Sequence, residues 1–247
     1  MSTPAPTIAN DVLTLERRGK VAVLTLTNGE NKQNLAFAEA MKAALAEVER
    51  DASVKSLVIT SSDEKNWSQG VDLNWLMAAM HGGKQDDIRA FMYAMNDVFA
   101  GLLTLPVPVI GALTGHAFGN GAMLACCCDF RVMRADRGYF CFPEVDISIP
   151  FLPSMIAFTR KAIPEPRFND LILSGRRATA EDLLADKVIT AAFPDAEATL
   201  AGALELAEGF SKSRAIFGEL KRRMHRDILR VMREEDPAYI DPLNLTV

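Results

Sequence analysis

Hydrophobic and polar positions along the chain follow two different periodicities. Short apolar runs bounded by glycine, proline or polar clusters indicate strands, and apolar residues three and four positions apart indicate helices. The first two strands are expected to form a hairpin of edge strands, because the polar segment 17–20 between them supplies a turn. The strands predicted from this pattern cover residues 12–15, 21–26, 54–60, 107–112 and 130–134.

Helical patterns separate these strands. Helices are predicted at residues 35–48 and 86–105, with further short strands at 139–142 and 187–192. After Pro150 the pattern is mostly helical. Strand, helix and strand in repeated succession predict an α/β fold with a mostly parallel sheet and crossover helices. The last helices are expected to form a separate layer or to contact a partner subunit.

Composition and charge narrow the function classes. A chain of 247 residues can form one large α/β domain, or one domain with a helical appendage. Its formal net charge of -5 argues against a broad nucleic-acid surface. The uncharged run 98–128 could span a bilayer as a helix, but prolines and glycines divide it into a strand, a turn and a helix start. Because the first residues also lack the blocks of a signal peptide, we expect a cytoplasmic protein without a membrane anchor.

Four cysteines raise the question of metal or redox chemistry. Three of them, Cys126, Cys127 and Cys128, are adjacent and cannot all turn inward on one face, and no CxxC spacing accompanies them. We therefore expect packing thiols in a reducing compartment and no metal site. Cys141 stands alone.

Two glycine-containing turns carry the candidate chemistry. Gly70 permits a left-handed backbone, which lets the next amide, that of Val71, point into a cavity. Gly119 and Gly121 flank Asn120 directly after a predicted strand, where free amides at a helix start carry partial positive charge. Taken alone, the first turn could be a surface loop and the second a close helix–strand contact. Neither a dinucleotide fingerprint nor a phosphate-loop lysine is present.

The two turns are more informative together. Each follows a predicted parallel strand, so both lie where such sheets bind ligands, outside the carboxyl ends of the strands. Two convergent amides can stabilise a thioester oxygen that becomes an enolate. With these turns the chain resembles the crotonase family of enoyl-CoA hydratases and isomerases over most of residues 11–215, and most strongly over 106–193.

The resemblance implies a fold and an assembly. The fold is an α/β crotonase-like ββα superhelix with a parallel sheet core and a C-terminal helical layer. Residues 1–193 correspond to the core and 194–247 to a helical trimerisation region. A homotrimer or hexamer is therefore expected.

The same resemblance assigns residue roles. Val71 and Asn120 correspond to the residues whose backbone amides form the oxyanion hole. Glu144 matches the second family glutamate, which handles the α-proton, and its apolar surroundings after Pro143 favour a strong base. Asp146 is a nearby rival acid without a family counterpart. The implied substrate-binding residues are Lys32, Ser68, Gly70, Asp72, Leu73, Asn74 and Gly119.

Two departures from the family pattern refine the functional expectation. The family has three glycines where this chain has Gly119, Asn120 and Gly121, and hydratases have a glutamate where this chain has Met123. Residues 133–150 are similar to the Δ3,Δ2-enoyl-CoA isomerase branch. The resemblance implies isomerisation by a single-glutamate proton shuttle, with coenzyme A as part of the substrate and no cofactor. A hydratase or another crotonase-type enzyme, or a non-catalytic acyl-CoA-binding protein, remains the alternative.

Overall fold

The computed structural model describes residues 7–244. Its main sheet has seven strands in the order β1-β2-β3-β5-β8-β10-β12. From β3 to β12 every neighbouring pair is parallel, whereas β2 runs antiparallel to both of its neighbours, β1 and β3. The strands span Ile8–Ala9, Leu13–Arg18, Val21–Leu26, Ser56–Ser61, Val109–Leu113, Phe130–Arg134 and Ala191–Phe193.

The predicted hairpin forms, but its strands do not lie at the sheet edge as expected. Leu13 pairs with Leu26 and Arg18 with Val21 across the turn. β3 also pairs with β5, and β1 covers the other side of β2. β1 contains only two residues, which is too short to produce a hydrophobic pattern, and so it could not be predicted from the sequence.

Three short strands form a separate parallel sheet in the order β11-β9-β6. The strand predicted at 139–142 is β11 and belongs to this small sheet. The predicted strand at 187–192 begins only at Ala191, because Lys187 adopts a left-handed φ of 59° and the chain turns there. A further two-stranded sheet joins β4 and β7. The bounds of these short strands are Asn66–Ser68, His116–Phe118, Phe140–Cys141, Lys32–Gln33 and Gly70–Val71 for β6, β9, β11, β4 and β7.

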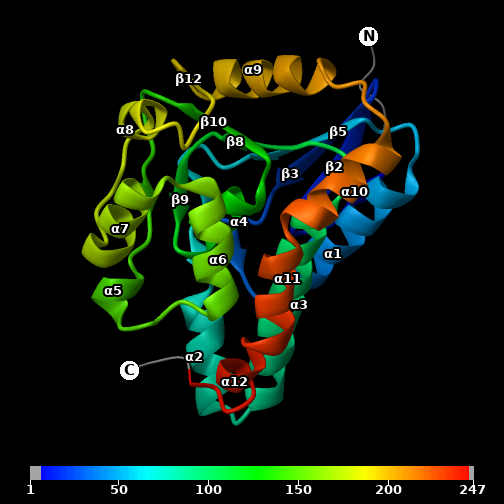
Figure 1. Ribbon diagram of the computed structural model, residues 1–247. Coiled ribbons are helices and arrows are strands. Elements are labelled where there is room, and N and C mark those ends of the chain that lie inside the picture. Colours follow the sequence, from blue (N-terminus) through cyan, green and yellow to red (C-terminus); the bar gives the residue numbers. More distant parts are fainter. Residues whose placement is uncertain (1–6, 245–247) are drawn as a thin grey trace.

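Helices cover both faces of the main sheet (Figure 1). Along β3 the side chains alternate: Leu24 joins the larger core with α1 and α3, and Val23 joins the smaller core with α9. This alternation is the period-two pattern of a strand buried on both faces. α1, α3 and α9 span Leu35–Arg50, Gln85–Thr104 and Ala196–Glu208.

The remaining helices extend beyond the sheet. α11 packs on α6, and α12 packs on α3. Asp236, fully buried ahead of α12, accepts hydrogen bonds from Asn96 and Ser154 and so ties three helices together. None of the helices found between residues 7 and 244 combines the length and the apolar composition that spanning a bilayer requires. These helices are α2 (Leu73–His81), α4 (Asn120–Cys127), α5 (Glu144–Ile147), α6 (Pro153–Ala162), α7 (Glu165–Ser174), α8 (Ala180–Ala185), α10 (Arg214–Met224), α11 (Arg226–Glu234) and α12 (Pro237–Ile240).

The division at residue 193 stays a prediction. α9, which follows it, packs directly on β5, β8 and β10 of the main sheet.

Candidate active site

The two glycine-containing turns meet at the carboxyl ends of the small parallel sheet. Gly70 follows β6 and adopts a left-handed φ of +79°. A Cβ at Gly70 would lie 2.6 Å from the Phe118 carbonyl oxygen and 3.0 Å from the Asn120 nitrogen. Only glycine permits this close approach. The backbones of the two turns are therefore in direct contact, as the sequence predicted.

In each of the two turns, one backbone N–H group is left without a partner in the neighbouring strand or helix. Val71 pairs with Gln33 in a parallel ladder, where the neighbouring Asp72 nitrogen donates to the Gln33 carbonyl oxygen over 2.8 Å. Because N–H groups alternate along a strand, the Val71 N–H points to the other side. Asn120 is the first residue of α4, so its N–H has no acceptor within the helix.

The Asn120 side chain explains how an asparagine fits between two glycines. Its Nδ2 donates to Gln33 Oε1 over 2.6 Å, and Gln33 Nε2 donates to Ser68 Oγ over 3.1 Å. Ser68 Oγ in turn donates to the Asn31 carbonyl oxygen over 2.7 Å. The amide side chain is thus held in a buried hydrogen-bonded chain that joins α4 to β4 and β6.

Asn31 and Gln33 were not singled out from the sequence. Both are fully buried, although they lie in a polar segment that resembles a surface turn. Two uncharged polar residues directly before an amphipathic helix were the available signal. Only the fold shows that they support the turn containing Asn120.

Glu144 begins the short helix α5 beside the glycine turn. A Cβ at Gly119 would lie 3.1 Å from Glu144 Oε1, so the carboxylate lies against the backbone that leads to Asn120. Burial raises the pKa of Glu144 to about 7. Its Oε2 is buried and has no hydrogen-bond partner within residues 7–244. A desolvated, unpaired carboxylate with this pKa is suited to general-base chemistry at neutral pH.

Asp146, the rival acid, faces a different part of the chain. It is exposed, and a Cβ at Gly175 would lie 2.5 Å from its Oδ2. Gly175 ends α7, away from the glycine turn. The structure therefore places the Glu144 carboxylate against Gly119 and that of Asp146 against Gly175.

Met123 lies one helical turn after Asn120 on α4. Its side chain is 2% exposed, within a helix whose residues are all buried. An apolar side chain at this position supplies no second carboxylate.

The predicted substrate-binding residues fall into two groups. Ser68, Gly70 and Gly119 gather at the paired turns described above. Asp72 instead caps α2, because its carboxylate accepts a hydrogen bond from the Trp75 nitrogen over 3.1 Å. Lys32 lies beside Gly70 in the β4–β7 ladder.

The Lys32 ammonium has a competing partner. It forms an ion pair with Glu30 over 2.6 Å, and this hydrogen bond raises the pKa of Lys32. A phosphate bound by Lys32 must compete with that carboxylate. Leu73 and Asn74, at the start of α2, are exposed and free to contact a ligand at the rim of the site.

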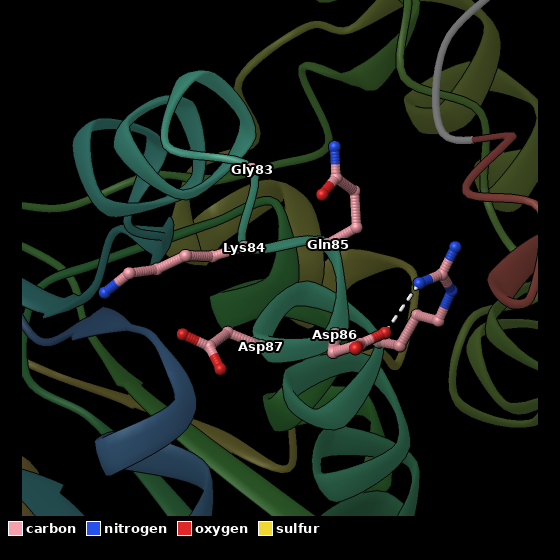
Figure 2. A pocket seen from close by; sticks show the side chains of 6 residues that line it. Gly83, Lys84, Gln85, Asp86 and Asp87 are labelled. Atoms are coloured by element: carbon pink, nitrogen blue, oxygen red, sulfur yellow. Dashed lines mark hydrogen bonds and ion pairs between the residues drawn. The ribbon is translucent and has the colours of Figure 1, made fainter.

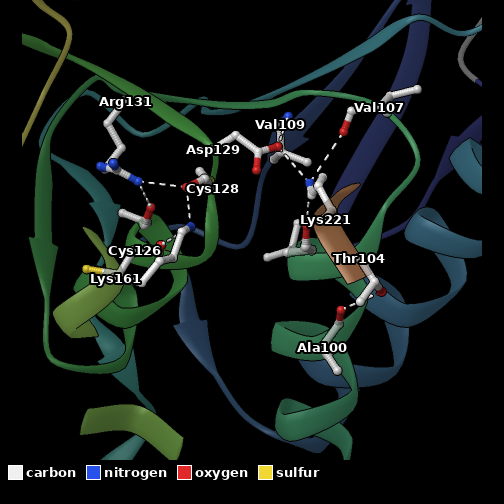
Figure 3. Close-up of polar contacts among 12 residues, drawn as sticks. Ala100, Thr104, Val107, Val109, Cys126, Cys128, Asp129, Arg131, Lys161 and Lys221 are labelled. Atoms are coloured by element: carbon white, nitrogen blue, oxygen red, sulfur yellow. Dashed lines mark hydrogen bonds and ion pairs between the residues drawn. The ribbon is translucent and has the colours of Figure 1, made fainter. Parts of the chain in front are cut away.

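Buried cations hold the far end of α4 (Figure 3). Arg131 Nη1 donates to the carbonyl oxygens of Ala125 and Cys128 over 3.2 and 2.7 Å. Lys161 Nζ donates to those of Cys126 and Cys128, over 3.1 Å each. Positive groups at a helix C-terminus complement its dipole and satisfy its last carbonyls. They fix the helix that presents the Asn120 amide.

A buried ion pair links α10 to Asp129, in the segment between α4 and β10. Lys221 Nζ lies 2.6 Å from Asp129 Oδ2, and the two side chains are 4% and 13% exposed. The same carboxylate accepts a hydrogen bond from the Val109 nitrogen over 2.9 Å. These contacts tie α10 to the start of β8.

The cysteine run packs in the core beside these cations. Cys126, Cys127 and Cys128 are fully buried, and burial raises the pKa of Cys126 to about 11, so this thiol is protonated at neutral pH. In the part of the chain that the structure describes, no group of three His, Cys, Asp or Glu side chains is arranged to hold a metal ion.

A surface hollow of about 530 Å³ lies away from this site, at the turn between α2 and α3 (Figure 2). It is lined by Lys84 and Asp87 and by Asp86, which pairs with Arg89 over 2.9 Å. The nine-residue helix α2, about 13 Å long, lies between this hollow and Asp72. Its mixed charges offer no convergent chemistry.

Comparisons with known proteins agree with this geometry. A model of the enoyl-CoA hydratase/isomerase family matches residues 16–241. Enoyl-CoA delta isomerase 3 of Arabidopsis thaliana is 30% identical over 228 residues, which cover 89% of this chain and 94% of the relative. The peroxisomal enoyl-CoA delta isomerase 2 of the same plant is 27% identical over 236 residues, covering 93% and 98%.

A solved structure supports the same fold. The probable enoyl-CoA hydratase of Mycobacterium tuberculosis superposes with a TM-score of 0.80 at 26% identity and covers 94% of each chain. The structure is therefore an α/β fold of the crotonase type. The chain belongs to the enoyl-CoA hydratase/isomerase family.

Proposed function

We propose that this protein is an acyl-CoA enzyme that isomerises 3-enoyl thioesters to 2-enoyl thioesters. One observation carries the proposal: a single desolvated carboxylate, Glu144, lies beside the glycine turn that contains Asn120. The position that corresponds to the other glutamate of the family's hydratases is occupied by the buried, apolar Met123. The similarity to delta isomerases points the same way.

The mechanism assigns one role to each part of the site. The thioester oxygen accepts hydrogen bonds from the amides of Val71 and Asn120. Glu144 takes a proton from C2, which leaves a dienolate whose negative oxygen these amides stabilise. The protonated Glu144 then returns the proton at C4, and the double bond moves from C3–C4 to C2–C3. Glu144 is regenerated as a carboxylate.

Coenzyme A enters this mechanism as the carrier of the substrate, and no further cofactor is needed for proton transfer. Leu73 and Asn74 are proposed to line the path of the pantetheine chain, with Lys32 near the phosphates once Glu30 is displaced. Ser68, Gly70 and Gly119 shape the pocket for the thioester, and Asp72 holds α2 in place.

A first prediction follows from the Glu144 pKa. The base must be ionised to take the C2 proton, and burial raises its pKa to about 7. Below that pH, kcat/KM for 3-hexenoyl-CoA should rise about tenfold per pH unit and then level off above it. The measurement is kcat/KM from pH 5.5 to 9. A profile that is already level at pH 5.5 would show that Glu144 is not the essential base.

A second prediction separates isomerase from hydratase activity. Isomerisation of 3-hexenoyl-CoA should be faster than hydration of 2-hexenoyl-CoA with the same preparation, because Met123 can neither hold nor activate water. Met123→Glu should raise the rate of hydration relative to that of isomerisation. Met123→Gln should not, because glutamine has the size of glutamate but no carboxylate. Faster hydration by the unchanged protein would favour the hydratase, and tight CoA-ester binding without any turnover would favour a non-catalytic protein.

We also propose that the chain assembles as a homotrimer or hexamer. α10 carries an exposed apolar stripe of Ile216, Leu220 and Met224, at helical spacing and between 51% and 71% exposed. Such a stripe favours burial against another subunit. Light scattering at micromolar concentration should give a mass of three or six chains, and a stable monomer would contradict this assembly.

The proposed location is the cytoplasm. The four free cysteines, all buried, are consistent with a reducing compartment. Tagging the full chain and following it by fractionation would test this.

A further inference from the structure

A cleft lies at the opposite end of the small parallel sheet from the candidate active site. β6, β9 and β11 run parallel, and their carboxyl ends lead to Gly70, Gly119 and Glu144. At their amino ends the three strands are preceded by Lys65, Gly115 and Tyr139. A cleft of about 510 Å³ opens at these amino ends, within the size range of small-molecule sites. Its lining includes Lys65, His116, Arg137, Tyr139 and Thr179.

Two cations line this cleft and a third lies beside it, and none of the three forms an ion pair within residues 7–244. Lys65 and Arg137 line it, and the Arg177 guanidinium lies 5.4 Å from the Phe118 ring centroid and 5.8 Å from that of Tyr139. Most lysine and arginine side chains of a protein with net charge -5 have acids available. Within residues 7–244, however, none of these three forms an ion pair (Arg18, Lys42 and Arg134, by contrast, each do).

The acids near the cleft are already engaged. The Asp136 carboxylate, which itself lines the cleft, accepts two hydrogen bonds from Arg134, over 2.7 and 2.6 Å, so the charges of this pair cancel. The Asp182 carboxylate accepts from the nitrogen and the hydroxyl of Thr179, over 2.9 Å each, in the cap of α8. The surroundings of the cleft therefore retain the positive charge of Lys65, Arg137 and Arg177.

His116 adds a hydrogen-bond donor. Its Nδ1 accepts from the Tyr139 nitrogen over 3.1 Å, so in the neutral ring the proton is on Nε2. The ring stacks on Tyr139 with centroids 5.6 Å apart. Burial, followed by the charges of Lys65, Arg177 and Arg137, lowers the pKa of His116 and keeps the ring neutral.

We propose that this cleft binds a small, multiply charged phosphate, of the pyrophosphate or nucleotide polyphosphate type, at a site separate from the active site. Arginine and lysine are the usual phosphate partners, and three unpaired cations need more negative charge than one carboxylate carries. The size of the cleft and the net negative charge of the chain favour a small ligand over an extended nucleic acid. The inference concerns binding alone and does not depend on the proposed isomerase activity.

The direct test is calorimetry of the full chain with inorganic pyrophosphate. One saturable site per chain is expected, and Lys65→Ala combined with Arg137→Ala should weaken it at least about tenfold, the factor that corresponds to about 1.4 kcal/mol. The matched control combines Lys20→Ala with Arg226→Ala, which removes the same charge from exposed positions elsewhere. Equal loss in the control, or no loss in the cleft variant, would overturn the proposal.

A second readout guards against a folding defect. The NMR titration of His116 should shift to higher pH when pyrophosphate binds, because the anion offsets the three cations. Arg177→Lys should retain binding better than Arg177→Ala if charge matters beyond packing on Tyr139. A His116 titration that pyrophosphate leaves unchanged would contradict binding at this cleft.

Competition distinguishes the possible ligands and sites. ADP that binds more tightly than pyrophosphate would identify a nucleotide as the ligand class, and equal affinity would identify the phosphates alone. Saturating hexanoyl-CoA should leave pyrophosphate binding within about twofold. Full displacement by hexanoyl-CoA would place pyrophosphate in the acyl-CoA site, and binding that disappears as subunits associate would assign the cleft to a subunit interface; either result refutes the proposal.

Discussion

Replacing Glu144 by glutamine is expected to lower turnover of 3-hexenoyl-CoA by at least about a hundredfold while CoA-ester binding persists. The substitution keeps the size of the side chain and removes the base, and positioned general acid–base groups contribute about 10²- to 10⁴-fold. The measurement is kcat by single-turnover kinetics, together with the Kd for a non-reactive saturated acyl-CoA.

Asp146→Asn is the matched control for this substitution, because Asp146 is a carboxylate two positions away that faces Gly175. It should leave kcat within about threefold, since it makes no contact needed for proton transfer. Near-normal turnover in Glu144→Gln, with loss in Asp146→Asn, would transfer the role to Asp146.

Stability separates loss of the base from loss of the fold. Burial raises the folded-state pKa of Glu144 to about 7, so the folded protein holds this proton more tightly than the unfolded chain does. The contribution of Glu144 to stability therefore falls as pH rises from about 4.5 to 7, where the buried charge forms. Glu144→Gln, which stays neutral, should be at least as stable as the parent at pH 8.

Replacing Gly70 by alanine is expected to lower kcat by about 10²- to 10³-fold, the usual cost of losing one oxyanion donor. The added Cβ would lie 2.6 Å from the Phe118 oxygen and 3.0 Å from the Asn120 nitrogen, and both are backbone atoms that cannot move aside alone. The left-handed φ of +79° adds strain for alanine. The two turns should separate, and the amides of Val71 and Asn120 should no longer converge.

Gly83→Ala provides a matched control for this clash. Gly83 has a similar φ of +70°, but a Cβ there would meet nothing within 4 Å. It introduces the same backbone strain without moving the site. A loss of kcat as large in Gly83→Ala as in Gly70→Ala would attribute the effect to general destabilisation and not to the oxyanion hole.

The sequence predicted most of the main sheet, because its strands are continuous apolar runs between clear breaks. Val21 to Leu26 and Phe130 to Arg134 match their predicted bounds. The two-residue strand β1 and the strands β6 and β9 of the small sheet were not predicted, since segments of two or three residues carry no measurable period. Lys187 shows a related limit: its apolar neighbours suggested a strand, but a left-handed φ turns the chain there.

The candidate site was only partly predictable for a different reason. Gly70 and Glu144 could be assigned through the resemblance to the crotonase family, because the local sequence around each is equally compatible with a surface position. Their contacts with Asn120 and Gly119 arise from segments about 50 and 25 residues away along the chain, and only the fold brings these together. The buried support from Gln33 and the competition of Glu30 for Lys32 likewise depend on tertiary contacts.

Transfer of deuterium tests the single-carboxylate shuttle most directly. 3-Hexenoyl-CoA labelled with deuterium at C2 is converted in ordinary water, and the early product is analysed by mass spectrometry and NMR. Because Glu144 is buried and carries the proton from C2 to C4, 2-hexenoyl-CoA should contain deuterium at C4 above the level produced by solvent. Product that carries only solvent hydrogen at C4 in the earliest samples would contradict the shuttle and require a second proton donor.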